Sequence, residues 1–366
     1  MSIVCRNIIN EIEKKFPLYL AEDFDNCGLI IGDFEKVVKR ILLCLEVNLD
    51  VVKEAVEKKV DMIISHHPII FRPIKRIIKD NYISKSIFEL IKNDINLYVL
   101  HTNFDNAIGG MNYIIANILE LDGIKPLSYN KSQELYKLTV YVPNTHVEQV
   151  REALFKAGCG YIGNYSCCSF NIKGEGTFMP LEGSNPYIGK QNELEKVDEI
   201  KIETIVKNQD IKKAIECMQK AHPYEEVAYD IYKLENKIND GTGTFGELKN
   251  EMIFGEFCQY VKEKLNIPYL NVAGHFNRKV KRIAVVGGAG AEFYKDAINK
   301  KCDVLLTGDV KHHQAIDAVN EGINLIDGGH YFTEVVAIPY IANYLSSLFE
   351  VECIVSKVNT NPFYKA

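Results

Sequence analysis

The sequence predicts an α/β protein in which two related β-α-β domains are separated by an inserted α+β domain. Three observations lead to this prediction. Two distant segments of the chain resemble each other, each alternates apolar strands with a helix, and the middle of the chain matches neither. The length of 366 residues suits two or three domains, and 47% apolar and 25% charged residues are typical of a globular protein.

The repeat relates Val38–Ser65 (VKRILLCLEVNLDVVKEAVEKKVDMIIS) to Val280–Thr307 (VKRIAVVGGAGAEFYKDAINKKCDVLLT). The two segments align without a gap and are identical at nine of 28 positions. Each contains a short apolar run, a stretch with apolar residues at helical spacing, and a second apolar run, which predicts strand, helix and strand. Because two copies show this pattern, the β-α-β prediction does not depend on one segment.

The similarity continues into the histidines that follow each copy. Six of the nine histidines fall into two sets of three, and each set has a carboxylate four residues after its last histidine. Such an arrangement is unusual for histidines scattered through a core. The first set is His66, His67 and His101 with Asp105, and the second is His312, His313 and His330 with Glu334.

The middle of the chain, from about Lys137 to about Leu234, predicts a domain of its own. KLTVYVP is a strand, YSCCSFNIKGEGTFMP is two strands around a turn, and EIKIETIV and EEVAYDIYKL are further strands. THVEQVREALFKAG and DIKKAIECMQKAHP are amphipathic helices. The order β-α-β-β-β-α-β is close to a ferredoxin-like arrangement. We therefore expect domain boundaries that divide the chain into 1–131, 132–236 and 237–366.

Each candidate site residue has an ordinary structural explanation when it is taken alone. His66 and His67 end a buried strand, where α/β sheets place ligands, but both reach one site only if the chain turns there. Asp105 also suits a turn or a helix cap, and His330 and Glu334 suit a pair on a helix surface. Together these imidazoles and carboxylates are enough ligands for two divalent metal ions, with Zn, Fe, Mn, Co and Ni as candidates.

Several segments resemble the Nif-three-like family, also called the GTP cyclohydrolase I type 2 family, whose members are dinuclear-metal hexamers. The matching segments are AEDFDNCGLIIGD, ISHHPIIF, HTNFDNAIGGMN, TGDVKHHQA and DGGHYFTE, and the resemblance covers residues 1–131 and 237–366. The chain departs from the family pattern at Phe24, where the family usually has Trp, and at Glu46, where it more often has Asp.

The resemblance implies the Nif-three-like fold with two divalent metal ions per subunit, zinc or iron before the others. The middle of the chain is similar to the PII- and CutA-like domains inserted in longer bacterial members. The resemblance further implies two groups of site residues. The metal ligands are His66, His67, Asp105, His330 and Glu334, and the other groups lining the cavity, which are candidate catalytic residues, are His101, His312 and His313.

Three functions compete at this point. The first is a metal-dependent hydrolase that acts on a nucleotide or phosphoester-like substrate through a metal-activated water. The second is a non-catalytic hexamer for metal storage, metal delivery or regulation. The third is a nucleotide-binding dehydrogenase that uses AVVGGAGAEF, but Gly287, Gly288 and Gly290 do not form G-x-G-x-x-G, and Asp303 is more simply a residue at the start of a strand.

The remaining features predict a cytoplasmic protein, and the resemblance implies that it is a homohexamer. The resemblance implies a toroid built from trimers, with the inserted domain over its openings and with a small-molecule or nucleotide ligand. A net charge of −6 disfavours nucleic acid, and no apolar stretch approaches the roughly 20 residues that cross a bilayer. The ten cysteines, among them Cys167 and Cys168, contain no C-x-x-C pair, and we expect free thiols.

Overall fold

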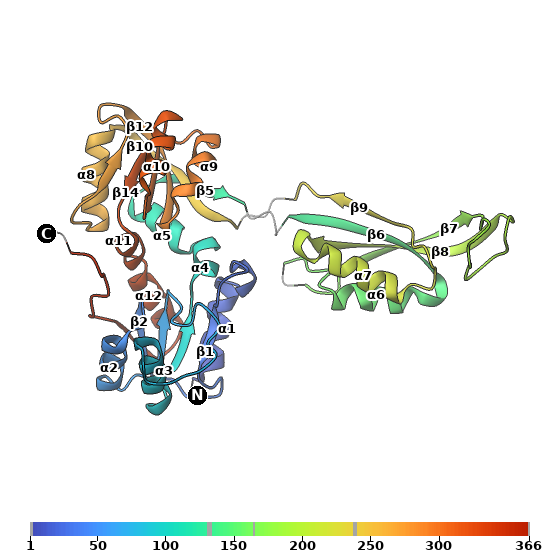
Figure 1. Cartoon of the computed structure of the whole chain (residues 1–366), viewed down its shortest axis with the longest axis horizontal. Coiled ribbons are helices and arrows are strands. Elements are labelled where there is room, and N and C mark those ends of the chain that lie inside the picture. The colour runs from blue at the N-terminus through green and yellow to red at the C-terminus, as the bar shows by residue number, and fades with distance from the viewer. Residues whose placement is uncertain (1–2, 130–133, 164, 237–239, 365–366) are drawn as a thin grey trace. The chain divides into compact units, whose positions relative to one another are not determined.

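The structure is a computed structural model that describes residues 3–129, 134–163, 165–236 and 240–364 (Figure 1). The chain divides into two compact units, of which the first comprises Met1–Ser128 and Asn239–Ala366 and the second Tyr129–Ile238. The boundaries expected after residues 131 and 236 fall within or beside residues 130–133 and 237–239, which lie outside the described residues. The two outer parts of the sequence thus fold together as one unit.

The first sheet of this unit has the strand order β1-β4-β3-β2-β15. Its strands are β1 (Gly28–Ile31), β2 (Arg40–Cys44), β3 (Met62–Ser65), β4 (Asn96–Val99) and β15 (Glu352–Val355). All neighbours pair in parallel except β1, which runs antiparallel to β4 at the edge. The central strands β3 and β4 are buried along their whole length, which explains their continuous apolar sequences.

The second sheet has the order β11-β14-β13-β12-β10-β5. Its strands are β5 (Asp122–Ser128), β10 (Thr242–Ile253), β11 (Asn271–Ala273), β12 (Lys279–Ala289), β13 (Val304–Gly308) and β14 (Asn324–Asp327). The strands β12, β13 and β14 are parallel, and β11 is antiparallel at the edge. On the other side β10 pairs antiparallel with both β12 and β5, and Thr242 of β10 lies opposite Ser128 of β5.

The order β1-β4-β3-β2 of the first sheet returns as β11-β14-β13-β12 in the second, which confirms the repeat. The equivalence extends to single side chains. One carboxylate oxygen of Asp61 accepts hydrogen bonds from two successive backbone N–H groups near the start of β2, at 2.7 and 2.9 Å. Asp303 does the same for β12 at 2.9 Å. The interpretation of Asp303 as a structural residue at a strand start is therefore confirmed.

One apolar core lies between the sheets and includes buried residues of both, such as Ile64 and Leu306. Helices complete the unit: α1 (Cys5–Lys15), α2 (Leu49–Glu57), α3 (Tyr82–Lys92), α4 (Thr102–Asn106), α5 (Met111–Ile118), α8 (Phe254–Leu265), α9 (Tyr294–Asn299), α10 (His312–Asn320), α11 (His330–Val335) and α12 (Ile338–Leu348). Within the described residues, no helix is both long enough and apolar enough to cross a membrane.

The second unit is a four-stranded antiparallel sheet with the order β7-β8-β6-β9 and two helices on one face (Figure 1). Its elements are β6 (Leu135–Pro143), α6 (Val147–Lys156), β7 (Ser169–Phe178), β8 (Glu195–Lys207), α7 (Ile211–Ala221) and β9 (Tyr229–Lys233). The order β-α-β-β-α-β and the central pair of β6 and β8 are those of the ferredoxin-like fold.

The predicted extra strand is wrong. The segment expected to be two strands around a turn is the single strand β7, which pairs with β8 without a break from Ser169 to Phe178. Gly174 and Gly176 lie within this strand. Ladder hydrogen bonds along the long neighbour β8 therefore outweigh the low strand preference of the two glycines.

We expect Asp61→Ala and Asp303→Ala each to lower the free energy of unfolding by about 1–3 kcal/mol, because each leaves two backbone N–H groups without their acceptor. Urea unfolding followed by circular dichroism measures the effect. The control is Asp317→Ala on the exposed face of α10, with an expected change of about 0.5 kcal/mol or less. Equal unfolding curves for Asp303→Ala and the control would refute the structural role.

Candidate metal centre

The first two histidines reach one cavity because the chain turns directly after β3. The backbone N–H groups of His66 and His67 donate to the carbonyl oxygens of Cys44 and Leu45 at 3.1 and 2.8 Å. The Ser65 hydroxyl then donates to the carbonyl oxygen of His67 at 3.0 Å. The two imidazole rings consequently lie side by side, with their centroids 4.9 Å apart.

Two short helices bring the carboxylates to these rings. Asp105 lies in α4, which follows β4, and His330 begins α11 with Glu334 one turn later. The cap of α4 is His101, so Asp105 is not a helix cap. His66 Nε2 lies 3.7 Å from an oxygen of Asp105 and 3.7 Å from Oε1 of Glu334.

Glu334, which comes from the second repeat, contacts histidines of both repeats. Its Oε2 lies 3.0 Å from Nε2 of His67 and 3.3 Å from Nε2 of His330. The Nε2 atoms of His67 and His330 are themselves 3.3 Å apart. Ligand atoms of His67, His330 and Glu334 therefore form one compact group, and those of His66, His67 and His101 form another.

Each histidine of the centre is oriented by an acceptor on its other nitrogen. Carboxylate and carbonyl oxygens only accept, so each Nδ1 carries a hydrogen and each Nε2 is the nitrogen directed to the centre, where it binds a metal ion once it is deprotonated. The Nδ1 acceptors are Leu100 O for His66 at 2.8 Å, Glu46 for His67 at 3.2 Å, Asp25 for His101 at 2.8 Å and Asp309 for His330 at 2.7 Å.

Two atoms of the centre are buried without a hydrogen bond, namely His66 Nε2 and Glu334 Oε2. Buried polar atoms in this condition are rare in folded proteins. The two atoms belong to neighbouring side chains, since His66 Nε2 lies 3.7 Å from the other oxygen of Glu334, and both groups bind divalent cations. The residues present therefore fit divalent metal ions, which would satisfy these atoms.

The electrostatics of the centre favour positive charge. Burial would lower the pKa of His67, but contacts with Glu334 and Glu46 outweigh it and raise this pKa to about 10. Burial would also lower the pKa of His330, but contacts with Glu334 and Asp309 outweigh it and raise this pKa to about 9. The pKa of Glu334 is held well below its usual value because its histidine contacts outweigh its complete burial. The carboxylate thus stays ionised where a cation would bind.

The glycine-rich segment at the end of β12 serves this centre rather than a dinucleotide. The N–H groups of Gly287, Gly288 and Gly290 donate to side-chain oxygens of Asn112, Thr333 and Thr307, at 2.8, 3.0 and 2.9 Å. They are not available to a pyrophosphate, which removes the basis of the dehydrogenase alternative. Gly288 has a φ of +62°, and a Cβ there would lie 2.2 Å from Oε1 of Glu334.

Comparison with known proteins agrees with this geometry. The family model for Duf34/NIF3 (NGG1p interacting factor 3) matches residues 3–362. The chain belongs to the NIF3 family. A protein of Halalkalibacterium halodurans named GTP cyclohydrolase 1 type 2 homolog is 42% identical over 364 residues, with 98% of each chain covered. A Bacillus subtilis protein of the same name is 42% identical over 368 residues, with 99% of this chain and 98% of that protein covered.

Solved structures show the same fold. The structure of a Bacillus cereus protein related to NIF3 is 40% identical, with a TM-score of 0.69 and full coverage of both chains. Staphylococcus aureus protein SA1388 is 33% identical, with a TM-score of 0.74 over 100% of this chain and 99% of that one. The Nif-three-like fold with an inserted α+β unit is therefore that of this chain.

Two of the histidines expected in the cavity are not there. His312 and His313 open helix α10, are exposed, and do not line the cavity in the described part of the chain. In the second repeat, four residues (Gly308–Lys311) separate Thr307 of β13 from this pair. In the first repeat, His66 directly follows the equivalent residue Ser65 of β3. The insertion carries the pair into the helix, and His101 alone of the three candidate catalytic residues faces the centre.

The orienting carboxylates were missed in the sequence. Asp25 lies in the matching segment AEDFDNCGLIIGD and Asp309 in TGDVKHHQA, but nothing in their spacing ties them to a histidine. Glu46 was noted only as a departure from the NIF3 pattern, and it contacts His67. Asp25 is held by His101 and by the Thr102 hydroxyl, and these contacts lower its pKa although burial opposes them.

Above the centre lies a cavity of about 690 Å³, a size that suits a small molecule. Its wall includes His67, His101 and His330, together with aromatic side chains such as Tyr269 and Phe332. The described residues that line it contain no lysine or arginine.

We expect Gly288→Ala to abolish tight metal binding, because its Cβ would displace the Glu334 carboxylate. Elemental analysis after dialysis against each metal measures the bound metal. The matched control is Gly123→Ala, since Gly123 has nearly the same φ, +63°, and its Cβ would meet nothing within 4 Å. Undiminished metal content in Gly288→Ala would show that Glu334 is not required for binding.

Proposed function

We propose that this protein is a metal-dependent hydrolase that acts on a nucleotide or phosphoester-like substrate. The observation that carries the proposal is the pair of buried, unsatisfied atoms at the centre, His66 Nε2 and Glu334 Oε2, beneath an open cavity. Two divalent ions would be held by His66, His67, Asp105, His330 and Glu334. Zinc and iron are the first candidates, followed by manganese, cobalt and nickel.

Glu334 supports a site for two ions rather than one. Its two oxygens face different partners, because Oε1 is directed to His66 and Oε2 to His67 and His330. Metal ions held by these residues would polarise a carbonyl or phosphoryl oxygen and lower the pKa of a water molecule.

His101 is the side chain best placed to move a proton. Asp25 accepts from its Nδ1, so its Nε2 faces the cavity as a proton acceptor. The ring lies 5.0 Å from that of His66 and 5.4 Å from that of His67, beside the candidate ligands. Its role in the proposed reaction is general base, with Asp25 as the group that orients it.

The names of the relatives make GTP the first substrate to test. Protein loaded with each metal in turn is incubated with GTP and with simple phosphoesters, and products are followed by chromatography. We expect Glu334→Gln to lose metal and at least 100-fold in turnover, as is typical when a metal site is dismantled. Glu263→Gln, an equal charge change on the exposed surface of α8, serves as control.

Turnover that survives in metal-free Glu334→Gln would overturn the proposal. If metal-loaded wild-type protein leaves all substrates intact but transfers its metal to an apo-protein acceptor, storage or delivery replaces hydrolysis as the function. Hydrolysis and metal delivery therefore predict opposite results in the turnover assay and the metal-transfer assay.

We also propose a homohexamer, a toroid built from trimers, in the cytoplasm. The resemblance to the family supports the assembly, and exposed apolar side chains such as Phe24, Phe170 and Phe276 provide surface for it to bury. All ten cysteines are free, which suits a reducing compartment. Light scattering on the purified protein is expected to give about six times 41.6 kDa, and a monomer at micromolar concentration would refute the assembly.

A further inference from the structure

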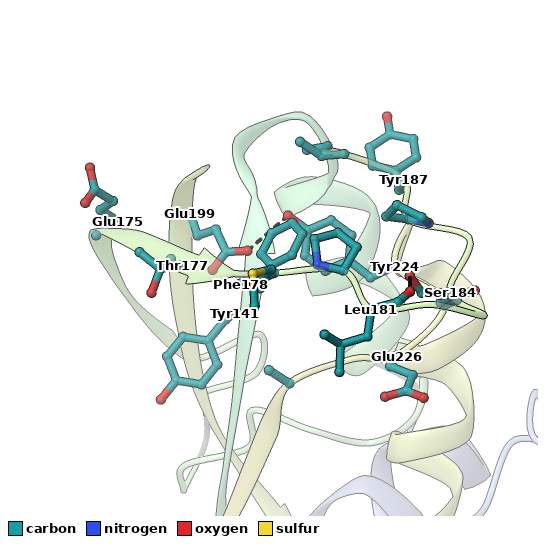
Figure 2. Close-up of a pocket in the computed structure, with 18 of the residues that line it drawn as sticks. Tyr141, Glu175, Thr177, Phe178, Leu181, Ser184, Tyr187, Glu199, Tyr224 and Glu226 are labelled. Atoms are coloured by element: carbon teal, nitrogen blue, oxygen red, sulfur yellow. Dashed lines mark hydrogen bonds between the residues drawn. The ribbon is translucent and has the colours of Figure 1, made fainter. Parts of the chain in front are cut away.

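The unit 129–238 contains a cavity of its own, of about 990 Å³ (Figure 2). It lies on the face of the sheet that carries no helix. Val140, Val142 and Ile202 are buried on the helix-covered face, whereas Tyr141 and Glu199 alternate to the opposite face and line the cavity. The residues that follow β7 and those that precede β9 form its walls.

The floor of the cavity depends on the two glycines of β7. Gly174 pairs with Glu199 across the sheet, and Gly176 pairs with Val197. A Cβ at Gly176 would lie 2.2 Å from Oε2 of Glu199, whereas a Cβ at Gly174 would meet nothing within 4 Å. Gly176 therefore makes room for the Glu199 carboxylate, and Gly174 leaves empty space beside it.

Aromatic rings surround this carboxylate. Figure 2 shows Glu199 directed toward Phe178 and Tyr224, with a dashed line to the Tyr224 hydroxyl, which donates to Glu199 at 3.1 Å. The ring centroid of Tyr224 lies 5.8 Å from that of Phe178 and 6.3 Å from that of Tyr187. The carboxylate thus faces the rings of Phe178 and Tyr224, and the ring of Tyr187 lies beyond Tyr224.

The position of Tyr224 is fixed by a histidine that the metal centre does not use. The backbone N–H of Tyr224 donates to Nδ1 of His222 at 3.1 Å, so Nε2 carries the hydrogen and donates to the carbonyl oxygen of Tyr141 at 2.9 Å. Across the cavity, the backbone N–H of Asn185 donates to Glu225 at 2.8 Å and joins the two walls. The cavity is therefore preorganised by hydrogen bonds on both sides.

The charge of the cavity is unbalanced. Its lining carboxylates are Glu175, Glu182, Glu199, Glu225 and Glu226. The lining basic residue in the described part of the chain is Lys201, which already pairs with Glu203 at 2.7 Å. Glu175 pairs with Lys196 at 3.1 Å, but within the described residues Glu199 has no basic side chain in ion-pair range. The cavity therefore favours a positively charged ligand.

We propose that this cavity binds a small organic cation that has a primary ammonium group and an apolar body. The ammonium group donates hydrogen bonds to Glu199, and the rings of Phe178, Tyr187 and Tyr224 contact the adjoining carbon atoms. A carboxylate acceptor distinguishes this ligand from a quaternary amine, which has no N–H to donate. The size of the cavity lies at the upper end of the range for small-molecule sites, so an extended diamine or polyamine fits it.

Calorimetric titration of the full-length protein with spermidine and with diaminooctane tests the proposal, at about 0.15 M salt, where diffuse attraction to an acidic protein is screened. Octanediol, which has the same carbon chain without charge, and choline, a quaternary amine, are the comparison ligands. We expect one diamine or polyamine per chain to bind at least tenfold more tightly than either comparison ligand.

Two variants locate the site. Glu199→Gln keeps the size of the side chain and its contact with Tyr224 but removes the charge, and we expect affinity to fall about tenfold or more. Gly174→Val fills part of the empty floor, since its Cβ would meet no protein atom within 4 Å, and should lower affinity similarly. Glu216→Gln, an equal charge change on the exposed part of α7, and His330→Ala at the metal centre should bind as wild type does.

Thermal unfolding followed by circular dichroism establishes that each variant is folded. Equal affinity for diaminooctane and octanediol in the wild-type protein overturns the proposal. So does unchanged affinity in both Glu199→Gln and Gly174→Val, or loss of affinity in His330→Ala, which would place the cation at the metal centre instead.

Discussion

The candidate metal centre depends on one recurring hydrogen bond, from Nδ1 of a histidine to an oxygen that can only accept. Four histidines make it, to Leu100 O, Glu46, Asp25 and Asp309. Each bond fixes the rotation of its ring, so the Nε2 atoms converge on one space. Glu334 can contact the Nε2 atoms of His67 and His330 because these rings are held in place, and Gly288 leaves the room that Glu334 needs. Removing an acceptor would free a ring to rotate, and the centre would then have to be assembled at each binding event.

The repeat could be predicted because parallel strands that are buried on both faces leave a continuous apolar signal, and two copies of it support each other. The repeat also grouped six histidines and two carboxylates into two sets, whereas the ligand set itself was implied by the resemblance to the family. The grouping failed for His312 and His313, because the four residues Gly308–Lys311 changed the element on which the pair lies. Asp25 and Asp309 could not be found by spacing, because their partners lie far along the chain and meet them only in the folded unit.

The inserted unit shows another limit of local patterns. The segment that contains Gly174 and Gly176 was expected to form two strands around a turn, and glycines between strand-forming residues often lie at turns. Their actual effect is to remove side chains from a continuous strand, which opens space beside Glu199. Local preference and tertiary context disagree here, and such disagreement is common where a surface is shaped for a ligand. His222 also shapes this surface, because its Nδ1 accepts from the backbone N–H of Tyr224 while its Nε2 donates to the carbonyl oxygen of Tyr141.

The pairing of Thr242 with Ser128 has a consequence for the history of the chain. These residues face each other across β10 and β5, so the whole inserted unit occupies the place of a hairpin loop. Domain insertion is tolerated at such loops, because neither strand has to change its partner. A gene could therefore acquire or discard the segment in a single recombination event and still encode an intact host domain. After loss of the segment, a turn of a few residues would be enough to join β5 to β10.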